Sequence, residues 1–277
     1  MSNSQDPPRR RRPSLPLRRP IGPYPFLSAP SPLAFAHRGG AQTEDENSLS
    51  AFGRAVDVGY RYMETDVHVS SDGVPVLFHD DTLERMTGDP RPIASFSSAQ
   101  LEQLRVHGEP LVPRLTDALA AWPEVKWNLD IKADAAVAPT WRAIVSASAI
   151  DRVLVASFSD RRLAQIRSLA GPRLATSMGQ GEVTRLWMSS KLARGWWGFV
   201  PNVPAAQVPI TSGSLRVVTP RFIDWAHRLG VAVHVWTVND PSIMRTLLDM
   251  GVDGIMTDNI EQLATVYQSR GLWPSDA

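Results

Sequence analysis

The feature that most constrains the fold of this chain is a regular alternation of strand and helix patterns from residue 115 onward. Short apolar runs, typical of strands buried on both faces, are followed by segments whose apolar residues recur at helical spacing. Strands are predicted at 126–132, 153–158, 173–177, 206–210, 231–238 and 253–257, and helices at 115–122, 139–149, 161–169, 182–192, 220–229, 241–250 and from 260 onward. This alternation indicates an α/β protein with a parallel sheet.

Two more strands are predicted nearer the N-terminus, at 33–37 and 62–69, with a helix over 51–59 between them. When the segment 74–79 is counted as a hairpin extension of the second strand, the strands number eight. Eight such units close into a barrel, and roughly 250 residues is the typical length of a single (β/α)8, or TIM, barrel. The alternative, an open doubly wound sheet, would need a glycine-rich phosphate loop after its first strand, which Gly39-Gly40 alone does not provide.

Two segments depart from the barrel pattern, and we expect the barrel itself to span residues 31–277. Residues 81–113 are polar and rich in proline, glycine and serine, which predicts a small insertion after the second strand. Residues 1–30 form a tail rich in proline and arginine, whose first 20 residues hold six arginines against a single acid, Asp6. Segments of this composition bury too little apolar surface to fold, so the tail is expected to be disordered.

The composition excludes several classes of protein. The chain holds no run of 18 apolar residues, so the sequence predicts no transmembrane helix. It holds no cysteine, which excludes disulfides, thiolate metal sites and cysteine nucleophiles. No continuous apolar segment follows the basic tail, so we expect no secretory signal and a cytoplasmic protein. The tail is expected to be solvated or in weak, peripheral contact with an anionic membrane; no nucleic acid partner is predicted, and the oligomeric state stays open.

The second strand and the segment after it predict a hairpin that gathers polar groups. Asp72-Gly73 is a strong signal for a two-residue loop between 62–69 and 74–79. With that loop, His79 would lie opposite Asp66, and opposed residues point to the same face. Glu64, two residues from Asp66, shares this face. Two carboxylates and an imidazole would then converge, an arrangement that suits a divalent cation beside a proton-transfer group.

Other polar side chains stand at the ends of neighbouring strands. His37 ends the first strand, and Asn128, Asp130 and Lys132 share one face of the third at a spacing of two. In a parallel barrel, the C-terminal ends of the strands build the active site. The carboxylates, in the absence of any thiolate, favour a hard cation held by oxygen atoms, Mg²⁺ or Ca²⁺, over zinc.

Taken in order, the motifs HRGGA, ENS, ETDVH, DGVPVLFHDDTLER, NLDIK, VASF, HVWTVND and GVDGIMTD make the chain resemble the glycerophosphodiester phosphodiesterase family from about residue 34 to residue 268. This resemblance implies that His37 and His79 act as general acid and base and that Glu64 and Asp66 bind a divalent cation. The third ligand of that family is usually the glutamate of a Glu-x-Lys motif. Here the matching residue is Asp130, which is one methylene shorter and could draw the metal toward its strand or bind it through water.

The resemblance also assigns a phosphate-binding role to Arg38 and Lys132. Because in-line attack adds negative charge to the phosphoryl oxygens, a cation and these two side chains would stabilise the transition state. Trp236, near the end of its strand, is expected to line the pocket. Asn47 is either a helix cap, a role that Ser48 could also take, or a further substrate contact. The nucleophile, water or the neighbouring glycerol hydroxyl, is left open.

Three functions follow as hypotheses. The first is metal-dependent hydrolysis of a glycerophosphodiester to glycerol phosphate and an alcohol. The second is a lysophospholipase D reaction on lysophospholipids, which needs an apolar groove from the insertion or from the aromatic cluster of Trp187, Trp196, Trp197 and Phe199. The third is a catalytically idle barrel that binds phospholipid head groups, which the presence of both histidines and all three acids argues against.

Overall fold

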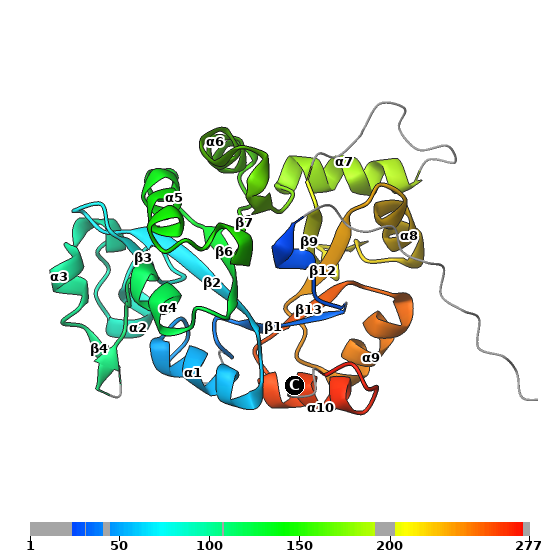
Figure 1. Ribbon diagram of the computed structural model, residues 1–277, viewed down its shortest axis with the longest axis horizontal. Coiled ribbons are helices and arrows are strands. Elements are labelled where there is room, and N and C mark those ends of the chain that lie inside the picture. Colours follow the sequence, from blue (N-terminus) through cyan, green and yellow to red (C-terminus); the bar gives the residue numbers. More distant parts are fainter. Residues whose placement is uncertain (1–23, 31, 41–44, 107, 192–202, 274–277) are drawn as a thin grey trace, which may run out of the picture.

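The computed structural model describes residues 24–30, 32–40, 45–106, 108–191 and 203–273, and its centre is a barrel of parallel strands (Figure 1). The strands are β1 (Leu33–His37), β2 (Tyr62–Val69), β6 (Lys126–Ile131), β7 (Val153–Ala156), β8 (Ala175–Thr176), β9 (Ala205–Pro209), β12 (Ala232–Trp236) and β13 (Gly254–Thr257). They are paired in the order β8-β7-β6-β2-β1-β13-β12-β9. A single parallel bridge between Ser177 and Ala205 joins the two ends, which confirms the predicted (β/α)8 barrel.

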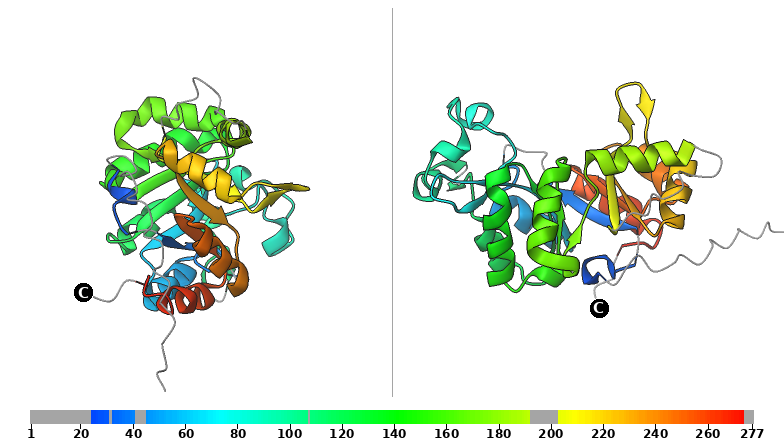
Figure 2. Two further views of the ribbon diagram at one scale, coloured as in Figure 1. Left: turned by 90° about the vertical axis from the view of Figure 1, so that its right-hand side faces the viewer. Right: turned by 90° about the horizontal axis from the view of Figure 1, so that it is seen from above.

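Helices cover the outside of the barrel (Figure 2). They are α1 (Leu49–Val58), α4 (Leu115–Ala121), α5 (Val137–Ser146), α6 (Asp160–Ala170), α7 (Gln180–Lys191), α8 (Pro220–Arg228), α9 (Pro241–Met250) and α10 (Ile260–Gln268). The short 3-10 helices Asp134–Ala136, Ile150–Arg152 and Gly171–Arg173 lie at their ends. Several of these helices begin where the sequence supplies a capping side chain: the Ser48 hydroxyl accepts from Ala51 N–H, and Asp240 caps α9 in the same way. None of the described helices is long and apolar enough to cross a membrane.

The inside of the barrel is apolar at one end and polar at the other. Along β2, the inward residue Tyr62 belongs to the apolar interior, and the next inward residues, at a spacing of two, are Glu64 and Asp66. The 3-10 helix Pro25–Leu27 closes the apolar end with Phe26, which is 1% exposed and packs edge-to-face on Tyr62. The polar end, where the strands finish, is therefore the end that can hold a site.

The packing of Phe26 changes the predicted boundary of the tail. Residues 24–30 were expected to be part of a disordered segment, but they contain a helical turn that closes one end of the barrel. The Lys126 ammonium donates a hydrogen bond to the Pro25 carbonyl oxygen in this turn at 2.8 Å. The buried ring of Phe26 supplies the apolar surface that the arginine-rich part of the tail lacks. Residues 1–23, with the arginine run, lie outside the described residues, so their contact with a membrane stays a prediction.

The insertion lies beside β2 and β3 (Pro75–Leu77) at one side of the barrel (Figure 1). It contains α2 (Glu84–Thr87), the 3-10 helix Ile93–Ser95, α3 (Ser98–Leu101), and the short strands β4 (Arg105–Val106) and β5 (Glu109–Pro110). A small apolar core of its own includes Leu83, Ile93, Phe96 and Leu101. This core makes the insertion a packed unit, although its sequence is mostly polar.

A second excursion follows β9. The hairpin of β10 (Thr211–Ser212) and β11 (Leu215–Arg216) projects from the barrel beside α7 (Figure 2). It forms where the sequence predicts a Gly-Ser turn after a weak strand. Of the aromatic cluster considered above, Trp187 lies on α7, while Trp196, Trp197 and Phe199 fall outside the described residues.

Candidate active site

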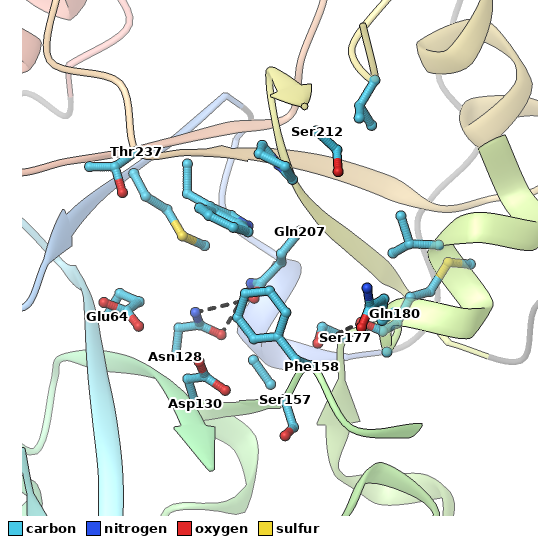
Figure 3. A pocket seen from close by; sticks show the side chains of 18 of the residues that line it. Glu64, Asn128, Asp130, Ser157, Phe158, Ser177, Gln180, Gln207, Ser212 and Thr237 are labelled. Atoms are coloured by element: carbon cyan, nitrogen blue, oxygen red, sulfur yellow. Dashed lines mark hydrogen bonds between the residues drawn. The ribbon is translucent and has the colours of Figure 1, made fainter. Parts of the chain in front are cut away.

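A pocket of about 630 Å³ opens at the polar end of the barrel. Eight of the nine predicted site residues line it: His37, Arg38, Glu64, Asp66, His79, Asp130, Lys132 and Trp236. The ninth, Asn47, does not. Figure 3 shows Glu64, Asn128 and Asp130 on one side of this pocket and Gln180 and Ser212 on the other. The barrel thus brings together side chains as far apart in sequence as His37 and Met256.

His37, the last residue of β1, has a carboxylate near each of its ring nitrogens. Its Nδ1 lies 2.6 Å from Asp258 Oδ1, and its Nε2 lies 3.7 Å from Glu64 Oε2. Burial alone would lower the pKa of His37, but the carboxylates of Glu64 and Asp258 outweigh burial and raise it above its ordinary value. Asp258 is itself fixed, because the Asn239 amide donates to its second oxygen at 2.8 Å. The imidazole therefore has a defined orientation and a bias toward its charged form.

Glu64 and Asp66 are a buried carboxylate pair on β2. Burial and the charge of Asp66 raise the pKa of Glu64 to about 7. Burial would also raise the pKa of Asp66, but the nearby Lys132 and Arg38 outweigh it and hold that pKa below its usual range. The two acids thus respond in opposite directions, because the cations lie closer to Asp66 than to Glu64.

Lys132 lies between two of the predicted ligands. Its Nζ is 2.8 Å from Asp66 Oδ1 and 2.7 Å from Asp130 Oδ2, so its ammonium joins β2 and β6 at the pocket wall. Burial would lower the pKa of Lys132, but Asp66 and Asp130 raise it above its ordinary value. The second oxygen of Asp130 is buried and accepts no hydrogen bond from any residue that the structure describes. This oxygen is free to accept a bond from a ligand or to coordinate a cation.

The turn after β1 positions Arg38. The backbone of Arg38 and Gly39 adopts positive φ angles of 52° and 81°. A Cβ atom at Gly39 would lie 2.8 Å from the Cβ of Ala51 on α1, so only glycine lets this turn pack so closely. Arg38 Nε then lies 3.2 Å from Asp66 Oδ2, and its Nη1 donates to Glu46 Oε1 at 3.2 Å. The guanidinium is therefore anchored next to the carboxylate pair.

Asn47 is hydrogen-bonded to Asp66 and lies outside the pocket. It is fully buried; its amide nitrogen donates to Asp66 Oδ2 at 3.0 Å, and its carbonyl oxygen accepts from the Thr65 hydroxyl at 2.7 Å. The cap of α1 is Ser48, so Asn47 is not the helix cap. It also lacks the pocket exposure that a direct substrate contact requires. Asn47 is therefore placed to orient Asp66, which differs from both predicted roles.

The register of the predicted hairpin was wrong by one residue. The observed pairs Val67–Leu77 and Val69–Pro75 require a three-residue loop, in which Gly73 N–H donates to Ser70 O and Gly73 has a φ of 81°. A three-residue loop ending in a left-handed glycine is a common hairpin, which the two-residue interpretation overlooked. β3 ends at Leu77, so His79 reaches the pocket from an irregular bend and not from a paired strand position.

Other contacts fix this bend and the ring of His79. The buried imidazole of His68 donates to the His79 carbonyl oxygen at 3.2 Å. His79 Nδ1 lies 2.6 Å from Asp80 Oδ1, and about a third of its side chain is exposed. Both histidines of the pocket thus have an aspartate partner on Nδ1, which leaves Nε2 for other contacts.

One wall of the pocket is apolar and open. Phe158, Met188 and Leu215 line the pocket and are 56%, 48% and 55% exposed. Phe158 and Trp236 pack edge-to-face at 5.6 Å. The side-chain amides of Gln207 and Asn128 are hydrogen-bonded to each other, as the dashed lines in Figure 3 show. This wall can accommodate a part of a ligand that is not charged.

The sequence reasoning missed Asp258, Asn239, Asp80 and Gln207. Asp258 and Asn239 directly follow the predicted strands 253–257 and 231–238, and Asp80 follows His79. Their position after a strand end was a usable signal, because the strand ends meet at the site. Gln207, in the middle of a weak strand, gave no comparable signal.

Across the described residues, no cluster of three or more carboxylate, imidazole or thiolate groups has the spacing of a ready-made metal site. Phosphodiester cleavage needs positive charge beside the phosphoryl oxygens and groups that accept and deliver protons. Arg38 and Lys132 supply the charge, and the two histidines can transfer protons. The fold and the pocket thus have the groups that a TIM-barrel hydrolase of phosphoric diesters needs.

Comparison with known proteins specifies the family. The glycerophosphoryl diester phosphodiesterase family model matches residues 37–262. A probable glycerophosphodiester phosphodiesterase 2 of Mycobacterium tuberculosis is 36% identical over 90% of this chain and 95% of its own length. The chain belongs to the glycerophosphoryl diester phosphodiesterase family and is a phosphoric diester hydrolase.

More distant relatives also match most of the chain. A rat lysophospholipase D is 23% identical over 80% of this chain and 82% of its own length. A phosphodiesterase of Oleispira antarctica, solved in complex with its product sn-glycerol-3-phosphate, has a TM-score of 0.70 and 22% identity and covers 86% of this chain and 97% of its own. This structure shares the barrel fold.

Proposed function

We propose that this protein hydrolyses glycerophosphodiesters to glycerol phosphate and an alcohol, with a divalent cation, Mg²⁺ or Ca²⁺, and with His37 and His79 as general acid and base. The observation that carries the proposal is the convergence of two aspartate-held histidines with the Glu64–Asp66 pair at one end of the barrel. The product complex of the Oleispira antarctica phosphodiesterase, which has the same fold, supports glycerol phosphate as the product.

Glu64, Asp66 and Asp130 would hold the cation. Two observations fit this role. One buried oxygen of Asp130 accepts no hydrogen bond from the described residues and so has lone pairs available for a cation. The raised pKa of Glu64 indicates that the nearby positive groups do not fully balance its negative charge. Oxygen donors alone favour Mg²⁺ or Ca²⁺. When bound, the cation would polarise the phosphate and neutralise part of its charge. Lys132 already contacts Asp66 and Asp130, so the cation would share these carboxylates with it.

The chain's own residues perform the remaining steps. Arg38 and Lys132 attract the phosphate and stabilise the charge that accumulates on its oxygens during attack. One imidazole accepts a proton from the nucleophile, and the other donates one to the leaving alkoxide. Asp258 and Asp80 keep both rings oriented for these transfers. Detection of a cyclic glycerol phosphate would identify the neighbouring hydroxyl as the nucleophile, and its absence in a rapid-quench time course would identify water.

The test is an assay of release of choline from glycerophosphocholine by the purified protein, by His37→Ala and by His79→Ala. The matched control is His227→Ala, because His227 Nε2 also lies 2.6 Å from an aspartate, Asp253, but outside the pocket. We expect both site variants to lose most activity, roughly 100-fold or more, and the control to keep it. Full activity in either site variant would contradict the acid–base assignment.

Metal dependence is tested separately, by exhaustive dialysis against EDTA followed by addition of Mg²⁺ or Ca²⁺. We expect activity to disappear and then to return with one of the two ions. Unchanged activity after dialysis would refute the metal proposal. A native protein that binds glycerophosphocholine but never cleaves it would instead support the idle head-group binding barrel.

The apolar wall favours a second candidate, a lysophospholipase D activity. An acyl chain attached to the glycerol could lie against Phe158, Met188 and Leu215 without leaving the pocket. The name of the rat relative supports this substrate class. Assays with lysophosphatidylcholines of increasing chain length test it: kcat/KM that rises with chain length supports the candidate, and a preference for glycerophosphocholine over every acylated substrate refutes it.

A further inference from the structure

Of the proposed acid–base pair, His79 has the less secure position. It lies beyond the end of β3 in an irregular bend, and its side chain is more exposed than that of His37, 34% against 15%. In the hydrogen bonds of the described residues, its ring has one protein partner, Asp80, at 2.6 Å. The orientation of His79 therefore depends on what holds Asp80.

Asp80 is held by an arginine of the insertion. Arg85 Nε, on the first turn of α2, donates to Asp80 Oδ2 at 2.6 Å. The other end of the same guanidinium donates through Nη2 to Glu46 Oε1. Arg85 thus spans two carboxylates that come from separate parts of the chain: Asp80, which bonds His79, and Glu46, which bonds Arg38.

Glu46 connects this arginine to the phosphate-binding side of the site. Its Oε1 accepts from Arg38 Nη1 at 3.2 Å as well as from Arg85. The Glu46 side chain is only 11% exposed, so its charge is shielded from water on most sides. A continuous set of charge-assisted hydrogen bonds therefore runs from His79 through Asp80, Arg85 and Glu46 to Arg38.

The backbone that carries Arg85 is itself fixed. Leu83, two residues earlier, is fully buried in the core of the insertion, and its N–H donates to the Arg91 carbonyl at 3.2 Å. The N–H of Ile93 donates to the Asp81 carbonyl at 2.9 Å. These hydrogen bonds fix the backbone on both sides of α2. The Arg85 guanidinium therefore extends from a fixed backbone, even though its side chain is 47% exposed.

Arg85 does not line the pocket, so it acts through other side chains and not on a ligand. We propose that Arg85 is a positioning residue for the reaction: it clamps Asp80 against His79 and is itself anchored by Glu46. The insertion after the second strand, which the barrel does not need for closure, thereby supplies part of the catalytic arrangement. This inference rests on the proposed function, because it gives His79 a role in proton transfer.

The experiment compares Arg85→Met with Arg91→Met in steady-state hydrolysis of glycerophosphocholine. Arg91 is the matched control, since it belongs to the same insertion and pairs with the surface residue Asp89. Displacement of a catalytic group by about 1 Å can cost 10²-fold in rate. We expect Arg85→Met to lower kcat about 10- to 100-fold while KM changes less than about threefold, and Arg91→Met to leave both near the native values.

A double-mutant cycle with Asp80→Ala separates positioning from a structural role. If Arg85 acts through Asp80, adding Arg85→Met to Asp80→Ala lowers kcat by less than about twofold further. Arg85→Lys, which keeps the positive charge but can bond only one of the two carboxylates well, is expected to retain an intermediate kcat and serves if the methionine variant unfolds. Thermal unfolding of every variant is measured alongside.

The outcomes divide clearly. Absence of activity in the native protein defeats the proposed function itself. If the native protein is active, then Arg85→Met with native kcat, or with losses that add to those of Asp80→Ala, overturns the inference alone. A lowered melting temperature with native kcat in the folded protein would likewise overturn it, because Arg85 would then only stabilise the insertion.

Discussion

The aspartate that orients His37 offers a stringent test of the site, through the substitution Asp258→Asn. In the native protein His37 Nδ1 donates to Asp258 Oδ1 at 2.6 Å, and Asn239 Nδ2 donates to the other oxygen at 2.8 Å. Asn239 cannot turn its amide over at no cost, because its carbonyl oxygen accepts from Asp258 N–H at 2.9 Å and from the Thr257 hydroxyl at 3.0 Å. Both oxygens of residue 258 thus face fixed donors.

An asparagine at this position satisfies only one of these donors. If its amide nitrogen faces Asn239, two N–H donors oppose each other. If it faces His37 Nδ1, the ring must carry its proton on Nε2, which is the other tautomer. In both orientations the charge-assisted hydrogen bond, worth about 1.5–3 kcal/mol, is lost. If the whole of this free energy stabilises the transition state of the native enzyme, its loss lowers kcat about 10- to 150-fold.

The assay is steady-state hydrolysis of glycerophosphocholine at saturating substrate, with KM expected to change little. Asp253→Asn is the control: Asp253 bonds His227 at the same distance of 2.6 Å, directly before the N-terminal end of β13, away from the pocket. It is expected to alter stability but not kcat. A kcat for Asp258→Asn within twofold of the native value, in a folded protein, would refute the assigned role of this hydrogen bond.

Three further predictions concern stability and substrate choice. Burial lowers the pKa of His234 to about 4, against 6.5 in the unfolded chain, so between pH 6.5 and pH 4 the unfolded chain binds a proton that the native protein does not. The native protein therefore loses stability as the pH falls, and we expect His234→Gln to remove up to about 3 kcal/mol of the loss measured by urea unfolding at pH 7 and at pH 4. The same loss in the native protein and the variant would contradict this. Asn47→Ala strands the Thr65 hydroxyl and loosens Asp66, so the free energy of unfolding should fall about 1–3 kcal/mol and more than in Asn47→Gly, which tolerates the positive φ. Leu215→Asp should raise KM for long-chain lysophosphatidylcholine more than for glycerophosphocholine, and an equal effect on both would remove Leu215 from the acyl-binding wall.

Much of the barrel was predictable because its signals are local. Valine-rich runs and helical spacing depend on neighbouring residues, and each of the eight barrel strands lies at or within two or three residues of its predicted place. The cap of α1 at Ser48 and the glycine that ends this helix, Gly59, are equally local signals. The hairpin register was not predictable from these rules alone, since loops of two and three residues can both use Asp72-Gly73, and the pairing is selected by the packing of the whole strand.

The candidate site divides in the same way. The sequence by itself determined which side chains lie at the strand ends, including His37, Glu64 and Asp130, because position at the end of a parallel strand is read directly along the chain. Only the tertiary structure decided which partners fix them. Asp258 reaches His37 because β13 pairs with β1, and Arg85 reaches Asp80 because the insertion folds on a core of its own. Such contacts depend on distances of a few ångströms between segments far apart in sequence, which closure of the barrel and packing of the insertion establish.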